Sequence, residues 1–290
     1  MALYAIPRRR WVERPFPGVP TRIDPGSALA RGLTFAYLPL NYSLREPNLV
    51  TGVVSAPGTT NPTFHYLPRV GLGWESVSTD VNQGINTLAT LGLIRGLSAF
   101  TVMVHGRNVI TPADGVRAPY LFEPVADNGF TRLGLEIARN TGAVVGTKVN
   151  VVFRTGTSAG TARFVNAGAG GTTLISGDVF VMHFTFDSVA DLYTLYLNGV
   201  QEAQLSVAES AIADTSPFFT PRLLGNTGAA PSGVVFRANV WNRVLSLGEM
   251  WQTVDPQTRW DLYWQPSRTV YFDLAATGKP WHYYAQQMSA

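Results

Sequence analysis

The 290-residue chain contains no cysteine. This absence excludes disulfides, thiolate metal ligands and cysteine nucleophiles together. Only four histidines are present, His65, His105, His183 and His282, and they are too far apart in sequence for the paired spacing of a zinc site. We therefore expect no metal centre and no cofactor.

Several other sequence patterns are missing. The chain has no G-x-S-x-G motif, no phosphate-binding loop and no dinucleotide-binding glycine pattern. No 18 uncharged apolar residues follow one another, which predicts no transmembrane span. The arginines near the N-terminus precede no apolar run, which predicts no secretory signal peptide. We expect a protein made in the cytoplasm that leaves the cell by lysis or as part of a particle.

Charge is scarce and unevenly placed. Charged residues make up 14% of the chain, and Lys148 and Lys279 are the only lysines. Residues 1–31 hold six arginines against Glu13 and Asp24, a net charge of +4, so the rest of the chain is close to neutral. The same segment contains five prolines, which disfavour helix and keep the backbone extended. We predict an extended N-terminal arm over residues 1–31.

From Gly32 onward the residue pattern is typical of a β protein. Short apolar runs alternate with Gly, Pro, Asn and Thr, and many have the period of two that places side chains on opposite faces of a strand. Seven strands are expected, over residues 100–104, 131–137, 149–153, 179–186, 193–197, 234–241 and 270–272. In the last long run, Val234, Phe236, Ala238 and Val240 are expected to share a face, opposite Arg237 and Asn239. So many strands favour two stacked sheets.

Two local signals are more specific. Asn198-Gly199 is a strong signal for a two-residue hairpin turn. Ser246 followed by Glu249 fits a capping box, and Asp255-Pro256 marks the end of the helix it begins. A second helical turn is expected over residues 258–264. The predicted fold is all-β, a two-sheet antiparallel jelly-roll sandwich over residues 32–273 with one short helix near the C-terminus, followed by an aromatic tail over residues 274–290.

Two segments carry a family resemblance. Residues 191–200, DLYTLYLNGV, are similar to a hairpin of concanavalin A-like, laminin-G-like and pentraxin-like jelly rolls. Phe236 to Trp251, within VFRANVWNRVLSLGEMWQ, resembles the last inner strand and short helix of that superfamily. Leu29 to Leu33, followed by Phe35 to Tyr37, and the Arg- and Pro-rich leader resemble such domains in tailed-bacteriophage proteins. The resemblance implies a fold more than a function, because such jelly rolls include lectins, hydrolases and assembly modules.

The resemblance also brings two functions into consideration, catalysis and calcium binding. Glucanases of this fold carry an E-x-D-x-x-E strand, and this chain has no such pattern, with Glu136 alone on its strand. We therefore expect no enzymatic activity. Pentraxin-like relatives hold calcium with loop carboxylates, for which Asp187, Asp191 and Asn226 are candidates, but we interpret all three as turn formers.

A lectin site would need exposed aromatic rings near polar groups. The candidates are Trp74, Trp260, Tyr263, Trp264, Trp281, Tyr283 and Tyr284. The helical spacing of Trp260 and Trp264 favours core packing, whereas the last three lie in the tail and suggest a partner surface. Nucleic acid is not an expected partner, because three adjacent arginines on a nearly neutral protein make only a small basic patch.

These features predict a non-catalytic virion structural protein of a tailed bacteriophage: a capsid decoration, cement or head-spike subunit. Its expected partners are major capsid or tail subunits and further copies of itself, with a trimer as one form. The alternative is a carbohydrate-binding, lectin-like module that recognises bacterial surface glycans, and a hydrolase ranks third. The predicted contact residues are Tyr4, Arg8, Arg9, Arg10, Trp11, Arg14 and Phe16 in the arm and Trp281, Tyr283 and Tyr284 in the tail.

Overall fold

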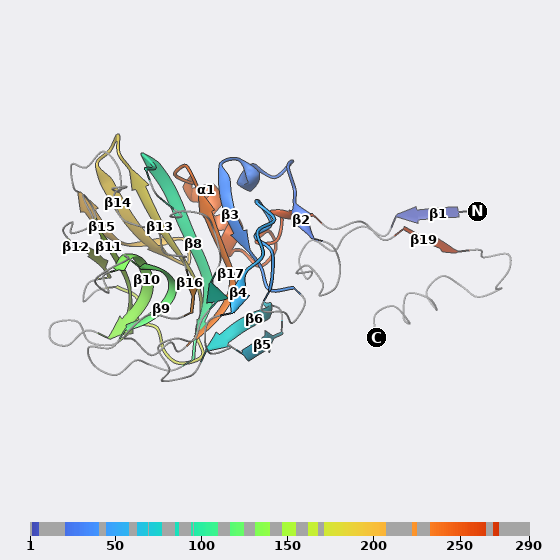
Figure 1. Ribbon diagram of the computed structural model, residues 1–290. Helices are drawn as coiled ribbons and strands as arrows, with labels where there is room; N and C mark the ends of the chain where they lie inside the picture. The colour runs from blue at the N-terminus through green and yellow to red at the C-terminus, as the bar shows by residue number, and fades with distance from the viewer. Residues whose placement is uncertain are drawn as a thin grey trace.

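A computed structural model gives the arrangement of the chain. It describes residues 2–5, 21–40, 45–57, 63–68, 70–76, 85–86, 94, 96–109, 117–124, 131–139, 147–154, 162–167, 171–206, 222–224, 233–264 and 269–272. Two antiparallel sheets face each other across these residues (Figure 1). The predicted two-sheet β fold is confirmed.

The larger sheet has the strand order β15-β14-β13-β8-β17-β6-β5, with β3 also paired to β17. Its strands are β3 Leu33–Tyr37, β5 Thr63–Leu67, β6 Gly71–Ser76, β8 Ala99–Asn108, β13 Val179–Asp187, β14 Leu192–Leu197, β15 Val200–Ser206 and β17 Gly233–Trp241. We call it the eight-stranded sheet.

The second sheet has seven strands in the order β12-β11-β10-β9-β16-β7-β4. They are β4 Ala56–Pro57, β7 Ile85–Asn86, β9 Arg117–Pro124, β10 Thr131–Arg139, β11 Thr147–Arg154, β12 Ala162–Asn166 and β16 Arg222–Leu223. Two short pairs complete the description: β1 Ala2–Ala5 with β19 Thr269–Phe272, and β2 Arg22–Ile23 with β18 Tyr263–Trp264.

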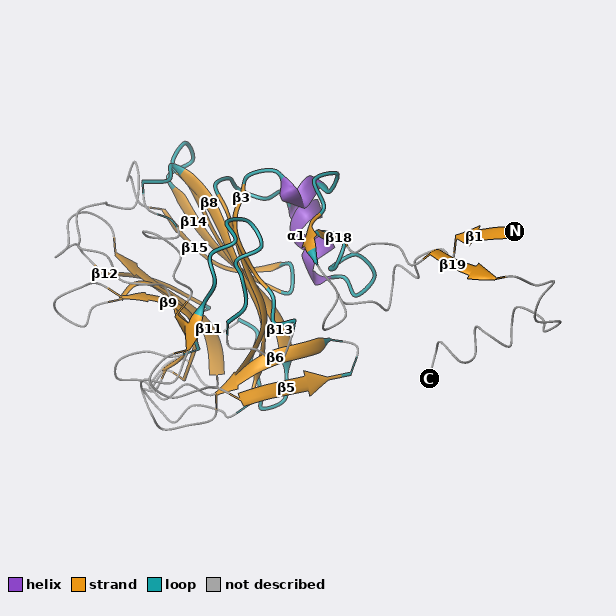
Figure 2. Ribbon diagram, turned by 45° about the vertical axis from the view of Figure 1, so that its right-hand side comes forward, coloured by secondary structure: helices purple, strands orange, loops and turns teal. Residues whose placement is uncertain are grey.

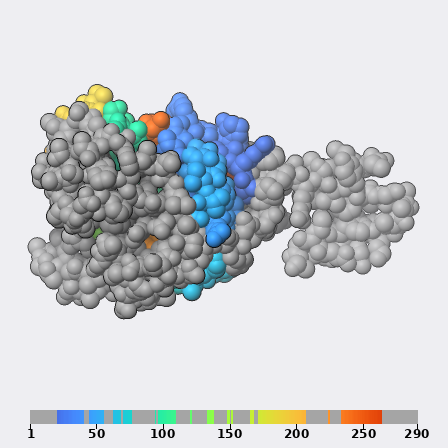
Figure 3. Space-filling model, viewed as in Figure 1, coloured from blue at the N-terminus to red at the C-terminus, as the bar shows by residue number. Residues whose placement is uncertain are grey.

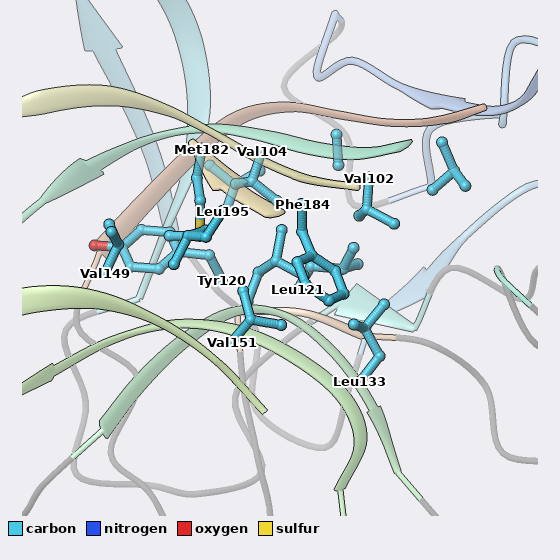
Figure 4. Packing of buried hydrophobic residues seen from close by; sticks show 14 of the residues in the cluster. Val102, Val104, Tyr120, Leu121, Leu133, Val149, Val151, Met182, Phe184 and Leu195 are labelled. Atoms are coloured by element: carbon cyan, nitrogen blue, oxygen red, sulfur yellow. The ribbon is translucent and has the colours of Figure 1, made fainter. Parts of the chain in front are cut away.

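The main core lies between the two sheets. Val102, Val104 and Phe184 of the eight-stranded sheet face Leu133 and Val151 of the seven-stranded sheet, and all are fully buried (Figure 4). These are the apolar positions that alternation predicts for inward-facing side chains. Each sheet also has an outer face, turned away from this core, and the outer faces hold the features of functional interest.

The prediction that Val234, Phe236, Ala238 and Val240 share one face is wrong. The pairing of β17 with β8 shifts register between Val235 and Arg237. This bulge places Val234 and Phe236 in a small separate cluster, whereas Ala238 and Val240 remain in the main core. A bulge adds one residue to a strand, so the alternation of faces changes phase across it, and no period-two pattern could have predicted that change.

The outer face of the eight-stranded sheet carries a second core. The helix α1, Leu247–Val254, lies against it (Figure 2). Met250 of the helix is buried there with Met103, Val181 and Trp241 of the sheet. The predicted capping box is present, since Ser246 Oγ accepts from the Glu249 amide and the Glu249 carboxylate accepts from the Ser246 amide. Residues 258–264, expected to form a second helical turn, instead form successive turns that lead into β18.

Residues 21–31 pack against this outer face. A 3-10 helix, η1 Ala28–Ala30, follows the cap residue Ser27 and buries Leu29. The indole Nε1 of Trp241 donates to the Leu29 carbonyl at 2.6 Å. In Figure 3 the blue residues 21–40 lead into the lighter blue 45–57, which form a strip down the visible face. This part of the segment that the sequence assigned to the arm is therefore built into the body.

Strand β1, near the N-terminus, and strand β19 form a separate two-stranded ribbon. Strand β1 pairs with β19 in the register Ala2 to Phe272 through Ala5 to Thr269 (Figure 1). An isolated two-stranded sheet is marginally stable in water. The ribbon is thus a segment that further contacts would stabilise.

Candidate functional site

The seven-stranded sheet presents a line of polar residues on its outer face. Glu136 of β10 stands opposite Asn150 of β11, which in turn stands opposite Asn166 of β12. Residues directly opposite in an antiparallel pair share a face, and the neighbouring Leu135, Val151 and Val165 occupy the core side. We call Glu136 and Asn166, which this register aligns through the backbone of Asn150, the polar row.

Lys148 lies one pleat from the row on the same strand as Asn150. Its ammonium donates to the carbonyl of Gly171 and to the hydroxyl of Thr173, the latter at 2.7 Å. Glu136 and Lys148 are each only 3% exposed although both lie on the outer face. A buried charged group must keep hydrogen-bonding partners. These two side chains are therefore held in a fixed orientation.

The row combines two kinds of hydrogen-bonding group, the carboxylate of Glu136 and the amide of Asn166. A carboxylate accepts, and an amide side chain both accepts and donates. Within the row there is one carboxylate, whereas glycoside hydrolysis of the usual kind needs two that flank the scissile bond. The arrangement suits recognition of a ligand rich in hydroxyl groups better than acid-base chemistry.

A second polar cluster lies beneath α1. Arg237, 1% exposed, donates from its two terminal nitrogens to the carbonyls of Arg259 and Thr253. Its guanidinium carbon stands 4.8 Å from the centre of the Trp260 ring. Burial lowers the pKa of Arg237 to about 10, so the group stays charged at neutral pH. Because Arg237 satisfies the carbonyls where α1 ends, we interpret the cluster as structural support.

Most of the contact residues predicted from the sequence lie outside the described residues. Tyr4 lies in β1, opposite Val270. Outside the described residues lie Arg8, Arg9, Arg10, Trp11, Arg14, Phe16, Trp281, Tyr283 and Tyr284. The assignment of these residues as an assembly surface stays a prediction.

Three of the predicted lectin aromatics cannot act as exposed platforms. Trp74 is fully buried in the main core, and Trp260 and Tyr263 are buried in the second core. The interpretation of Trp260 as core is confirmed, but its spacing reflects turns rather than a helix.

The calcium candidates are turn residues where the structure describes them. Asp187 Oδ1 accepts from the amides of Val189 and Ala190, at 2.9 and 3.4 Å, and Asp191 has a positive φ of 50°. Asn226 lies outside the described residues. Within the described part of the chain, no group of three or more His, Asp or Glu side chains could hold a metal ion. No helix there has the length and apolarity to cross a membrane.

Comparison with known proteins gives the fold and no family. No family model matches the sequence, and no curated protein matches it. Among solved structures, the binding domain of Paraclostridial Mosquitocidal Protein 1 matches with a TM-score of 0.53 at 14% identity, over 77% of this chain and 52% of that one.

Domain 4 of AbnA, an extracellular arabinanase from Geobacillus stearothermophilus solved with arabinotriose, matches with a TM-score of 0.52 at 11% identity, over 77% of this chain and 98% of that domain. Trypanosoma rangeli sialidase matches with a TM-score of 0.50 at 14% identity, over 86% of this chain and 36% of the sialidase. The chain thus spans about half of the toxin domain and about a third of the sialidase. At these identities the matches establish a shared β-sandwich fold.

Proposed function

We propose that the domain is a non-catalytic carbohydrate-binding module. The polar row is the observation that carries the proposal, because the register of β10, β11 and β12 aligns the carboxylate residue Glu136 with the amide residue Asn166 on one face. Sugar hydroxyls both donate and accept, and the exposed amide of Asn166, held on a rigid sheet, offers both functions with little loss of conformational entropy.

The fold supports this proposal over the virion role. One of the matched domains was solved with a bound sugar, arabinotriose, and two of the three matches belong to proteins that are named for action on carbohydrates. A sandwich fold alone does not assign a function. It does show that this architecture can present a sugar site.

The test is binding to an array of immobilised oligosaccharides that includes arabinotriose, followed by titration of the strongest binder. Asn166→Ala removes the exposed amide of the row, and we expect affinity to fall at least tenfold, about 1.4 kcal/mol. Glu136→Gln, which keeps the size of the buried side chain but removes its charge, should weaken binding as well. The control is Tyr66→Ala, which removes an exposed aromatic ring from the other sheet. No binding by the wild type, or equal losses in all three variants, would contradict the proposal.

A docking role in a virion is the second candidate, favoured by the β1–β19 ribbon. The ribbon joins the start of the arm to a strand just before the tail, so both predicted contact segments leave from one place. Partner strands would satisfy the open edges of such a ribbon. Removing residues 1–20 should abolish incorporation into particles if this role is right, and full occupancy by the truncated protein would refute it.

A further inference from the structure

The outward face of α1 carries two large apolar side chains. Leu247 is 56% exposed and Trp251, one turn later, is 49% exposed. The alternative face of the helix holds Met250 and Thr253, which are buried. About half of the Trp251 side chain therefore lies outside the second core, on a helix whose opposite face is buried against the sheet.

The indole lies over the hairpin turn between β14 and β15. A methyl group added to Gly199 would meet indole carbons of Trp251 at 3.0 to 3.2 Å, so the ring rests against the glycine backbone. This contact orients the ring, while half of its surface stays open to solvent. A large, oriented and half-exposed tryptophan is the kind of side chain on which flat ligands stack.

Polar neighbours lie on the same face of the sheet. Tyr196 of β14 stands opposite Gln201 of β15 and packs against the second core below α1. Gln204 donates from its amide nitrogen to the amide oxygen of Gln201 at 3.0 Å. Both glutamines are exposed. Their bond leaves the amide nitrogen of Gln201 and the amide oxygen of Gln204 as a donor and an acceptor for a ligand.

These four side chains, Trp251, Tyr196, Gln201 and Gln204, form the Trp251 platform, and none of them is charged at neutral pH. The adjacent acid, Glu202, uses both carboxylate oxygens on Thr172, at 2.8 Å to its amide and 2.6 Å to its hydroxyl. A site of aromatic and amide groups without a net charge matches an uncharged, hydroxyl-rich ring better than an ionic ligand.

We propose that the Trp251 platform is a second saccharide site, which binds a neutral sugar ring by stacking on the indole and by hydrogen bonds to the two glutamines. It lies on the eight-stranded sheet, whereas the polar row lies on the seven-stranded sheet, so the main core separates the two sites. The inference does not require the proposed site at Glu136. Two sites on one domain would let it bridge two glycan chains, which raises the apparent affinity for a dense surface.

The experiment uses the full chain and three neutral trisaccharides as probes, maltotriose, cellotriose and arabinotriose, titrated by calorimetry. Trp251→Ala and Gln201→Ala are compared with Leu247→Ala, which removes an equally exposed apolar side chain one turn away. We expect wild-type binding of at least one probe, a loss of at least tenfold in Trp251→Ala, a smaller loss in Gln201→Ala, and no change in Leu247→Ala. Thermal melting of each variant checks that it is folded.

The outcomes separate the two sites. If Glu136→Gln loses binding and Trp251→Ala keeps wild-type affinity, the polar row stands and the platform is overturned. If only the platform variants lose binding, the platform stands and the polar row fails. Equal losses in Trp251→Ala and Leu247→Ala, or no binding of any of the three probes by the wild type, would also overturn the platform.

Discussion

The ring nitrogen Nε2 of His183 lies 2.8 Å from the hydroxyl oxygen of Thr253, and this contact joins the eight-stranded sheet to α1. The Thr253 hydroxyl donates to the Met250 carbonyl at 2.7 Å. It therefore accepts from His183, which must carry its proton on Nε2. The other ring nitrogen, Nδ1, is buried without a hydrogen-bonding partner. The structure thus holds His183 neutral.

The first prediction concerns acid stability. Burial, together with the charge of Arg237, lowers the pKa of His183 from 6.5 to about 3. Between these values the unfolded chain binds a proton that the folded protein excludes, so the free energy of unfolding falls as pH decreases from about 6.5 to 3. The loss has an upper bound on the order of 5 kcal/mol.

Urea unfolding of wild type and His183→Gln at pH 7 and pH 4 measures the effect. The glutamine can still donate to Thr253 but does not titrate, so the variant should lose less stability on acidification than the wild type. His65→Gln, at a histidine whose side chain is 25% exposed, is the matched control. An equal reduction of the pH dependence in the control would reject the assignment to His183.

The second prediction compares two glycines. Asn198 and Gly199 have φ values of 51° and 80°, the pair of positive angles of a type I′ turn. Gly199→Ala should destabilise the protein by about 1–3 kcal/mol, because it places a methyl group in the left-handed region and against Trp251. Gly248→Ala, in α1 with open space around it, should stabilise by about 0.5–1 kcal/mol. Melting temperatures that move in the same direction would contradict this pair.

The third prediction concerns Glu249, which takes part both in an ion pair with Arg243 and in the capping box with Ser246. Its carboxylate accepts from both terminal nitrogens of Arg243, at 2.7 and 2.8 Å, and from the Ser246 amide at 2.9 Å. Arg243 lowers the pKa of Glu249 from 4.5 to about 2. The stability that the charged form provides is therefore complete above pH 4.5 and is lost as pH falls toward 2.

Glu249→Gln should be less stable than wild type at pH 7, and the difference should shrink below pH 4. Ser246→Ala, which removes the other half of the capping box, should cost about 1 kcal/mol. Because the serine does not titrate, that cost should not disappear in acid. Chemical denaturation across pH 2.5 to 7 measures both, and a constant difference for Glu249→Gln would refute the assignment.

The fourth prediction compares the contributions of residues 1–20 and residues 21–31 to stability. Arg243 donates to the carbonyls of Arg31 and Ala28, and Trp241 donates to that of Leu29. Removing residues 1–31 should therefore lower the melting temperature more than removing residues 1–20, since only the longer deletion takes away these acceptors and the buried Leu29 side chain. Trp241→Phe should itself cost about 1–3 kcal/mol by leaving a buried carbonyl unsatisfied. Equal melting temperatures of the two truncated proteins would contradict this division.

The sequence by itself determined the seven strands that its alternation predicts, which correspond to β8, β10, β11, β13, β14, β17 and β19, together with the hairpin turn at Asn198-Gly199 and the helix that begins after Ser246. Alternation did not predict strands such as β3, β5, β6 and β9. These features depend on residues close together in the chain, whose period, turn preference and capping chemistry are local. Along the expected strand 131–137, for example, Leu133, Leu135 and Ile137 occupy alternate positions, and all three belong to the main core.

Only the tertiary structure decided which strands are neighbours, and with them both candidate sites. Glu136, Asn150 and Asn166 come together through the register of β10, β11 and β12, and Trp251 meets Gly199 through the docking of α1 on the outer face. The bulge at Phe236 likewise depends on how β17 pairs with β8. Register and docking are set by contacts between residues far apart in sequence, and no local pattern records which of the many alternative pairings buries the most apolar surface.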